Sequence, residues 1–178
     1  EIPYEKVRKS CNDYEKKIIK AGGIDLQILG IGRTGHIGFN EPGSHFNSQT
    51  RLVKLDNVTR FDAAKSFQGI ENVPREAITM GIQTILGAKR IILMAWGSNK
   101  ALILKRAIEG EITSLIPTSY LQHNKNTTLV LDNESSSELT RIKTPWLVGA
   151  YEWNIENSAR AVIWLCEKTD KSILKLTD

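Results

Sequence analysis

The residue types best suited to chemistry gather in one glycine-rich loop, residues 30–44, directly after an apolar stretch. His36 and Glu41 are the titratable pair of this loop. Histidine exchanges protons near neutral pH, and a carboxylate beside it can fix its tautomer and raise its basicity. The loop therefore predicts an acid–base pair. The alternative is a histidine that only hydrogen-bonds a loop carbonyl.

The same loop begins with a Gly-x-Gly-x-x-Gly motif at residues 30–35. Placed after a strand, with Asp56 at the end of the next predicted strand, this motif outlines a dinucleotide site. Such a site requires a helix across residues 37–48, where two glycines and a proline interrupt the chain. The glycines can instead turn the backbone and present N–H groups to a phosphate or a sugar hydroxyl. We therefore favour a small ligand of this kind over a dinucleotide.

A second candidate anion site is the segment Gly97–Lys100, which precedes a predicted helix. Helix N-termini bind anions through free N–H groups, and Lys100 would add a positive charge. The alternative is an ordinary Ser98 cap followed by a solvated lysine. Three further basic residues are candidates for reaching a phosphate: Arg51, Arg60 and Lys65.

The elements that position these residues follow from hydrophobic periodicity and glycine punctuation. The predicted strands are residues 24–30, 51–56, 90–97 and 127–132. The predicted helices are residues 4–18, 57–70, 73–86 with Pro74 in the first turn, 98–109 with Ser98 as N-cap, and 157–168. Alternating strands and helices predict an open parallel α/β sheet, in which ligands bind beyond the carboxyl ends of the strands.

Length and composition fit one ordinary globular domain: 178 residues, 40% hydrophobic, 25% charged, with a net charge of +4. The basic residues are dispersed among acids, so no nucleic-acid groove is expected. No apolar run is long enough to span a membrane, and no secretory signal is present. Cys11 and Cys166 lie far apart and belong to no metal-ligand pattern. We expect a cytoplasmic protein without a structural metal.

Four segments match the pattern of a known family: Leu29–Pro42, Ser48–Arg51, Val73–Gly81 and Gly97–Ala101. Over about residues 24–148 the chain resembles glucosamine-6-phosphate deaminases, and its Gly-His-Ile-Gly-Phe-Asn-Glu-Pro run is the most specific part. The resemblance implies an α/β fold of the sugar-phosphate isomerase type. This fold is Rossmann-like, with three layers: an open, mostly parallel sheet and helices on both faces.

The resemblance also implies an amino-sugar phosphate deaminase, a hydrolase of amino-sugar catabolism. Such an enzyme converts glucosamine 6-phosphate and water to fructose 6-phosphate and ammonia. By analogy, His36 would be the acid–base group that opens the pyranose ring, and Glu41 would orient it. Moving a proton between C2 and C1 of the opened sugar requires only positioned acid–base groups and a clamp on the phosphate.

The remaining site residues also come from the resemblance. Gly30, Gly32 and Thr34 would line the sugar, while Lys100 and Lys65 would hold the phosphate. Lys65 stands where the family usually has arginine. The implied partner is a small phosphorylated amino sugar. No metal or organic cofactor is implied, and the whole protein would form a homo-oligomer.

The chain departs from the family pattern at functional positions. Thr34 stands where an acidic residue commonly supports the histidine, so ring opening would be slower or differently tuned. Ser44 and Arg51 match an allosteric site for a second amino-sugar phosphate, but His45 and Val53 replace a polar and a basic residue. Allosteric control is therefore not expected.

The resemblance also predicts how the domain is organised. Residues 1–178 would be one deaminase-like domain without the family's N-terminal part, which carries the proton-abstracting aspartate. Residues from about 150 to 178 would be a C-terminal extension. They are similar to longer deaminase-like chains in which a domain like sugar deacetylases follows. We expect the 178 residues alone to bind substrate weakly without turnover. The alternative function is a non-catalytic sugar-phosphate-binding domain attached to another enzyme.

Overall fold

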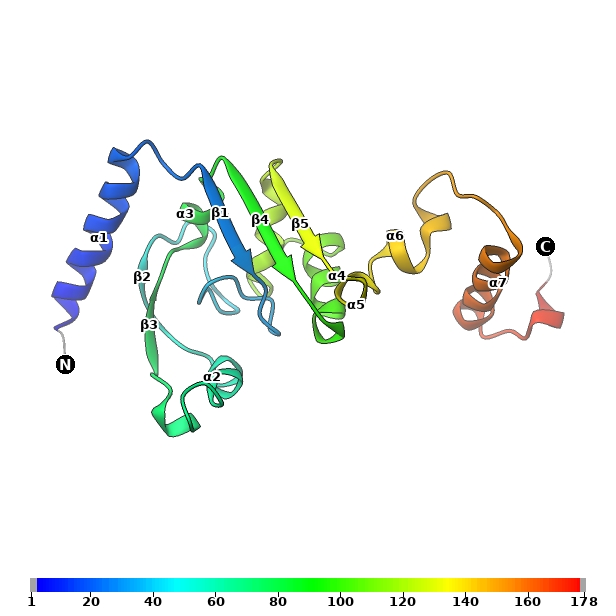
Figure 1. Ribbon diagram of the computed structural model, residues 1–178, viewed down its shortest axis with the longest axis horizontal. Coiled ribbons are helices and arrows are strands. Elements are labelled where there is room, and N and C mark those ends of the chain that lie inside the picture. The colour runs from blue at the N-terminus through cyan, green and yellow to red at the C-terminus, as the bar shows by residue number, and fades with distance from the viewer. Residues whose placement is uncertain (1–2, 177–178) are drawn as a thin grey trace. The chain divides into compact units, whose positions relative to one another are not determined.

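The computed structural model describes residues 3–176, which divide into two compact units, one ending at Ser136 and the other beginning at Ser137. The first unit is built around a parallel sheet of β1 (Leu26–Gly30), β4 (Arg90–Ala95) and β5 (Thr127–Leu131), paired in the order β1-β4-β5 (Figure 1). The predicted α/β class, a mostly parallel sheet flanked by helices, is confirmed.

The other elements of the first unit surround this sheet or extend from it. A separate antiparallel pair consists of β2 (Arg51–Lys54) and β3 (Glu76–Thr79). The helices are α1 (Tyr4–Lys20), α2 (Asn57–Ala63), α3 (Ile82–Leu86), α4 (Ala101–Glu109) and α5 (Asn133–Ser136). Short 3-10 segments are η1 (Ile70–Asn72), η2 (Ser98–Lys100) and η3 (Pro117–His123).

The core of this unit lies against one face of the sheet. Alternate side chains of β4 point to opposite faces, so Ile91 and Leu93 are fully buried while Arg90 is exposed. Further fully buried apolar side chains come from the glycine-rich loop, α3, α4 and η3: Ile37, Ile82, Ile85, Leu104 and Leu121. The other face is less covered, because Ile28 and Val130 are 57% and 41% exposed.

The predicted helix over residues 73–86 is wrong. Glu76–Thr79 forms β3, and only Ile82–Leu86 is helical. Pairing with β2 buries Thr79, so a tertiary contact overrides the local helical spacing. Gly81 separates the strand from the helix, and a Cβ there would collide with the backbone of Ser48.

Three other predictions need correction. The helix predicted over residues 57–70 ends at Ala63, and the chain then turns through Gln68 and Gly69 with positive φ. The helix predicted from Ser98 begins at Ala101 after a 3-10 turn, and the Ser98 hydroxyl makes no capping hydrogen bond. The strand predicted over residues 51–56 ends at Lys54 and joins the antiparallel pair, because its partner is β3 rather than β1 or β4.

The second unit contains α6 (Thr140–Lys143), α7 (Ile155–Thr169) and the 3-10 segments η4 (Pro145–Leu147) and η5 (Ile173–Lys175). Its aromatic side chains surround Trp146, whose ring centroid lies 6.0–6.5 Å from those of three others: Tyr151, Trp153 and Trp164. The Asn154 side chain caps α7, which therefore begins two residues before the predicted start.

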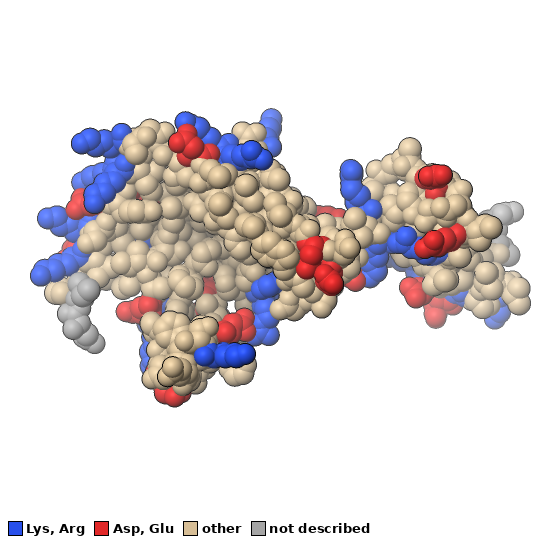
Figure 2. All heavy atoms as spheres, viewed as in Figure 1, with Lys and Arg blue, Asp and Glu red and all other residues tan. Residues whose placement is uncertain are grey.

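The charged side chains of the chain are interspersed rather than segregated by sign. Figure 2 shows Lys and Arg together with Asp and Glu over α1 and elsewhere on the viewed face. Within residues 3–176, no helix combines the length and the apolar character that crossing a bilayer requires.

Glu15 connects α1 to the segments before β2 and within α3. Its Oε1 accepts hydrogen bonds from the Thr50 amide (2.7 Å), the Thr50 hydroxyl (2.5 Å) and the Thr84 hydroxyl (2.7 Å). Burial raises the pKa of Glu15, but these hydrogen bonds outweigh it, so the pKa lies below its ordinary value. The folded chain therefore favours the ionised carboxylate.

We expect Glu15→Gln to lower the free energy of unfolding by about 1–3 kcal/mol at pH 7, because a buried charged acceptor becomes a neutral amide. Urea unfolding followed by circular dichroism measures this loss. Because the pKa of Glu15 is lower in the folded chain than in the unfolded chain, ionisation of Glu15 stabilises the native state. This contribution is complete at pH values above the unfolded Glu pKa of about 4.3. The difference between wild type and variant should therefore vanish as pH falls through the lowered pKa.

The matched control is Glu5→Gln, which removes an exposed carboxylate of the same helix that pairs with Arg8. Exposed ion pairs contribute little, so this variant should unfold at the wild-type urea concentration. Equal losses in both variants would show that Glu15 does not anchor α1.

Candidate active site

Parallel pairing of β1 with β4 brings two segments that carry candidate functional residues to one edge of the sheet. Gly30 at the end of β1 lies opposite Met94 in β4, so the glycine-rich loop and η2 both leave the carboxyl ends of adjacent strands. The charge of Lys100 acts on His36 and contributes to lowering its pKa. The structure thus brings His36 and Lys100 into one electrostatic neighbourhood, at the edge where α/β sheets bind ligands.

The glycine-rich loop is closed by Asn40, whose side chain is fully buried. Its amide Nδ2 donates to the carbonyls of Ile37 (2.9 Å) and Met80 (2.8 Å), and its Oδ1 accepts from Arg51 (2.9 Å). Residues 37–48 are turns with an isolated bridge between Ile37 and Asn40 rather than a helix. The condition for a dinucleotide site is therefore not met.

Asp56, the acidic residue of the dinucleotide hypothesis, has a structural role. Its Oδ1 accepts from the Val58 amide at 2.7 Å and caps α2.

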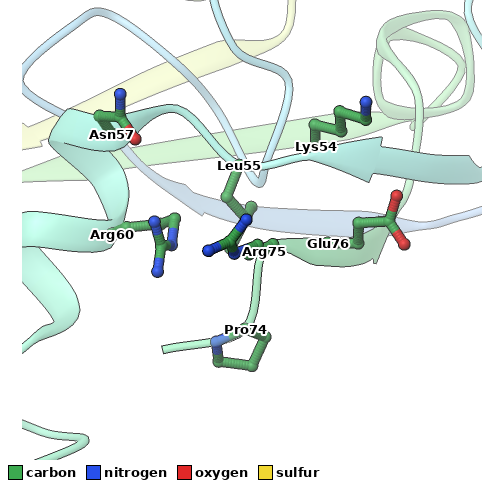
Figure 3. Close-up of a pocket in the computed structure, with 7 residues that line it drawn as sticks. All are labelled: Lys54, Leu55, Asn57, Arg60, Pro74, Arg75 and Glu76. Atoms are coloured by element: carbon green, nitrogen blue, oxygen red, sulfur yellow. The ribbon is translucent and has the colours of Figure 1, made fainter. Parts of the chain in front are cut away.

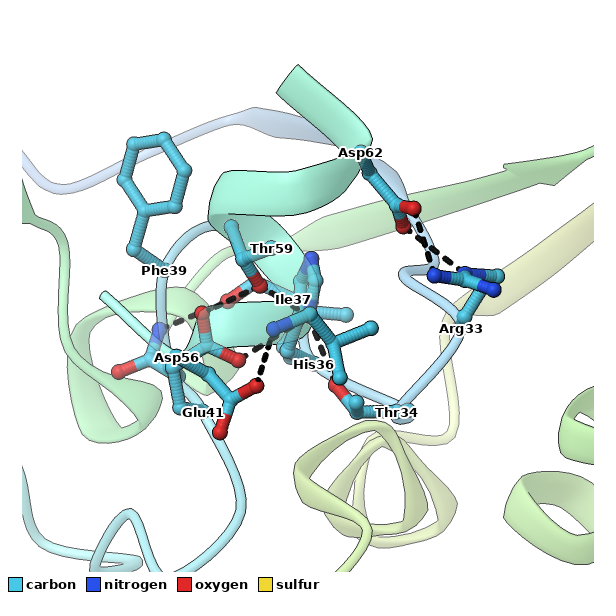
Figure 4. Close-up of polar contacts among 12 residues, drawn as sticks. Arg33, Thr34, His36, Ile37, Phe39, Glu41, Asp56, Thr59 and Asp62 are labelled. Atoms are coloured by element: carbon cyan, nitrogen blue, oxygen red, sulfur yellow. Dashed lines mark hydrogen bonds and ion pairs between the residues drawn. The ribbon is translucent and has the colours of Figure 1, made fainter. Parts of the chain in front are cut away.

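His36 is held through its Nδ1 atom, which faces three oxygen atoms (Figure 4). The Thr34 hydroxyl lies at 2.9 Å, Glu41 Oε2 at 3.2 Å and the Thr59 hydroxyl at 3.5 Å. In the described part of the chain, Nε2 has no hydrogen-bond partner. The ring therefore has one nitrogen engaged with the protein and one without a hydrogen bond to the described residues.

Glu41 is itself positioned by α2. The Thr59 hydroxyl donates to Glu41 Oε1 at 2.6 Å, and only 7% of Thr59 is exposed (Figure 4). Thr59 is a residue that the sequence did not single out. Its place on α2 becomes meaningful only when that helix lies over the loop.

The pKa of His36 lies below its ordinary value. Burial of the imidazole is the largest cause, and Lys100 acts in the same direction. Glu41, Asp62 and Asp56 oppose this effect, Glu41 most strongly. His36 is therefore neutral at neutral pH, which is the form that accepts a proton.

Gly32 makes room for the imidazole. A Cβ at this position would overlap the ring atoms of His36, including Nδ1 and Nε2. Gly35 turns the chain with a φ of 80°, and a Cβ there would press on Ile116 and Ile103 of the core. Gly32 is thus required by the packing of the His36 ring, and Gly35 by the packing of the loop on the core.

A second connection joins the loop to α2 through Arg33 and Asp62. Arg33 Nε donates to Asp62 Oδ2 at 3.0 Å, and Arg33 Nη2 lies 2.7 Å from Asp62 Oδ1. Lys100 lies close enough to Arg33 and Asp62 for the charges of both to shift its pKa. Burial lowers the pKa of Lys100 most, Asp62 raises it and Arg33 lowers it. A partly buried cation thus faces the region next to His36.

Lys65 and Gly30 are less closely connected with His36. Lys65 lies in the exposed turn after α2, and no hydrogen bond or ion pair joins its ammonium to another described residue. Gly30 is exposed at the end of β1. Lys65 as a phosphate-binding residue and Gly30 as a sugar-lining residue stay predictions.

Asp132 directly follows β5 at the same edge of the sheet, and the sequence analysis did not single it out. It accepts from the Gly97 amide at 2.9 Å and from the Ser135 amide at 2.8 Å. Hydrogen bonds from Ser135 and from the Gly97 amide lower the pKa of Asp132 to about 2. This carboxylate fixes the turn that leads from β4 to Lys100. The signal available in the sequence was an Asp that directly follows a strand and stands three residues before Ser135, a position from which its side chain can cap the next turn.

The arrangement suits proton transfer on a small anionic substrate. A buried neutral imidazole has a carboxylate behind it and a cation near it. Within residues 3–176, no three His, Cys, Asp or Glu side chains are grouped so that they could hold a metal ion.

Comparison with known proteins decides the family. Residues 1–130 match the model of the glucosamine-6-phosphate isomerases/6-phosphogluconolactonase family. The chain belongs to this family. Its structure is similar to that of a monomeric glucosamine-6-phosphate deaminase, with a TM-score of 0.72 and 44% identity over 74% of this chain and 54% of that one. A 6-phosphogluconolactonase from Trypanosoma cruzi shares the fold, with a TM-score of 0.61 at 23% identity, over 79% of this chain and 55% of that one.

Among curated family members, a glucosamine-6-phosphate deaminase of Alkaliphilus oremlandii is 50% identical over 76% of this chain and 56% of its own length. A glucosamine-6-phosphate deaminase-like protein of Bacteroides thetaiotaomicron is 51% identical over 99% of this chain but only 27% of its own length. The chain thus spans about half the length of the deaminases that it matches, and about a quarter of the longer relative.

We expect Gly32→Ala to displace the His36 ring, because the added methyl group occupies the position of the imidazole. The His36 Cε1–H resonance in an NMR spectrum should shift, and its titration should move toward that of a solvated histidine. Gly87→Ala is the matched control, since a Cβ there meets only ordinary contacts at 3.4 Å or more. An unchanged His36 resonance in Gly32→Ala would contradict the packing described above.

We expect Glu41→Gln to lower the pKa of His36 further, because it removes the strongest charge that favours the imidazolium. An NMR titration of the His36 ring measures the change. Glu111→Gln removes one exposed carboxylate elsewhere and should leave the titration in place. A pKa that stays the same or rises in Glu41→Gln would disprove the electrostatic coupling.

Proposed function

We propose that this chain is the sugar-binding and acid–base core of a glucosamine-6-phosphate deaminase. The reaction converts glucosamine 6-phosphate and water to fructose 6-phosphate and ammonia, a hydrolase reaction of amino-sugar catabolism in the cytoplasm. The observation that carries the proposal is the His36–Glu41 pair, 3.2 Å apart, in a loop at the carboxyl edge of a parallel sheet. Relatives at about 50% identity that are named as deaminases support it.

His36 has the properties that ring opening requires. With its proton on Nδ1, which contacts the Thr34 hydroxyl at 2.9 Å and lies 3.2 Å from Glu41 Oε2, the imidazole leaves Nε2 unprotonated to take up a proton from the sugar. Nε2 then returns the proton to the ring oxygen as the pyranose opens. Glu41 and Thr59 fix the tautomer and the orientation of the ring throughout.

Lys100 is the proposed phosphate ligand, together with Lys65. The Lys100 ammonium is partly buried beside the Arg33–Asp62 ion pair, and a bound phosphate would stabilise its charged form. Gly30, Gly32 and Thr34 are proposed to line the sugar. Clamping the phosphate at one end holds C1 and C2 at a fixed distance from the imidazole.

A non-catalytic sugar-phosphate-binding domain is the second candidate, and Thr34 favours it. The Thr34 hydroxyl contacts His36 Nδ1 at 2.9 Å but carries no charge to stabilise an imidazolium. The lowered pKa of His36 agrees with this weaker support. In that case the domain would bind the sugar phosphate for an attached enzyme without converting it. Assembly of the whole protein as a homo-oligomer stays a prediction, and the solved deaminase relative is described as monomeric.

Ammonia release from glucosamine 6-phosphate by the full-length protein tests the proposal. We expect measurable release, and a kcat reduced by about 10²–10⁴-fold in His36→Ala, which removes the acid–base group. His45→Ala is the matched control, because His45 directly follows the loop and is exposed, and among the described residues its side chain accepts a hydrogen bond only from the Asn47 amide. We expect Thr34→Asp to raise both the pKa of His36 and kcat.

The outcomes separate the two candidates. No ammonia from folded wild type or from Thr34→Asp, with sugar phosphate still bound, would favour the binding domain. Equal activity of His36→Ala and His45→Ala would remove His36 from the chemistry.

A further inference from the structure

A cavity of about 810 Å³ lies beside the β2–β3 pair, on residues that the proposed reaction does not use. Its lining includes Lys54, Asn57, Arg60, Arg75 and Glu76, whereas His36, Glu41 and Lys100 are not among the residues that line it. The volume falls within the range of roughly 300–1,000 Å³ common for small-molecule sites. The cavity is therefore large enough for a ligand of its own.

Two guanidinium groups converge in this cavity without an acid between them. Figure 3 shows Arg75 pointing toward Arg60, while the Glu76 carboxylate extends to the opposite side, where Lys54 also lies. Lys54 and Glu76 are cross-strand neighbours of opposite charge. Within residues 3–176, neither Arg60 nor Arg75 forms an ion pair with a carboxylate, so no salt bridge neutralises the two guanidinium charges.

Arg60 is held in place by backbone carbonyls rather than by a carboxylate. Its Nη2 donates to the carbonyls of Ile70 (3.0 Å) and Val73 (3.3 Å). Its Nε is buried and, among the described residues, has no hydrogen-bond partner. The guanidinium is thus oriented before any ligand arrives, and part of its donor capacity is unused.

Arg75 comes from a backbone segment that is equally fixed. Its carbonyl accepts from the Leu55 amide at 2.9 Å, which continues the β2–β3 pairing by one residue. Within residues 3–176, no carboxylate forms an ion pair with its exposed guanidinium. The positive charges of Arg60 and Arg75 repel each other, and an anion bound between them would attract both and offset that repulsion.

We propose that Arg60 and Arg75 bind the phosphate group of a small molecule in this cavity, at a site separate from the candidate active site. A phosphate monoester carries a charge of about −1.5 to −2 at neutral pH, which matches two guanidinium groups. Its three oxygens also suit the fork of donors that arginine presents. Either a phosphorylated sugar or free inorganic phosphate has this chemistry.

Isothermal titration of the full chain with inorganic phosphate tests the site. The double variant Lys65→Ala/Lys100→Ala serves as the starting protein, so that neither proposed phosphate ligand of the active site contributes. We expect this protein to bind phosphate. Adding Arg75→Gln should weaken binding about tenfold, the loss expected for one charge-assisted hydrogen bond. Arg106→Gln, an equal charge change at an exposed helix position outside the cavity, should leave the affinity unchanged.

Within residues 3–176 the exposed Arg75 side chain forms no hydrogen bond, so Arg75→Gln should keep the wild-type circular dichroism spectrum and thermal midpoint. Arg60→Lys is a second variant that keeps the charge but loses the fork, and it should also weaken binding. The proposal is overturned if Lys65→Ala/Lys100→Ala binds no phosphate. Equal affinities in Arg75→Gln and Arg106→Gln would overturn it as well.

A parallel titration with glucosamine 6-phosphate distinguishes the two sources of the phosphate group. In the Lys65→Ala/Lys100→Ala protein, binding that is tighter than that of inorganic phosphate and that Arg75→Gln weakens identifies a sugar monoester as the ligand of this cavity, and equal affinity identifies phosphate itself. Dependence on Arg75 separates this result from binding at the candidate active site, which Arg75 does not line.

Discussion

The parallel pairing of β1 with β4 is the constraint on which the candidate site depends. Because Gly30 lies opposite Met94, the loop with His36 and the turn before Lys100 leave the sheet at the same edge. A shift of the register by one residue would turn Leu93 from the core face to the other face of the sheet. Burial of β4 therefore fixes the register, and the register fixes that the segments with His36 and Lys100 leave the sheet side by side. Asp132, at the end of β5, secures the same edge from the other side.

Two kinds of contact convert a glycine-rich loop into a rigid site. Beneath the loop, the buried amide of Asn40 satisfies carbonyls of the loop and of the chain after β3, so the turns are held without a helix. Above it, α2 contributes Thr59 to Glu41 and Asp62 to Arg33. Buried polar groups are costly unless they are paired, which makes such a network specific. Loss of any member would loosen the imidazole.

The electrostatic consequence of this packing is a histidine that is neutral at neutral pH. Burial of the ring and the charge of Lys100 outweigh the carboxylates, and the uncharged Thr34 hydroxyl adds no opposing charge. A neutral imidazole can accept a proton. The same surroundings, however, stabilise the resulting imidazolium less than a second carboxylate would. The charge balance around Nδ1 therefore sets how readily the His36 ring takes up and releases a proton.

The sequence by itself determined the strands of the parallel sheet and the proximity of His36 to Glu41 in the loop after β1, because apolar runs and glycine turns are local signals. It failed over residues 73–86, where pairing with β2 makes Glu76–Thr79 a strand although the local spacing favours a helix. It also missed Thr59 and Asp132, and it could not bring Arg60 to Arg75, since these contacts join distant segments. Only tertiary structure decides such contacts, because burial and long-range pairing outweigh the weak preferences of single residues.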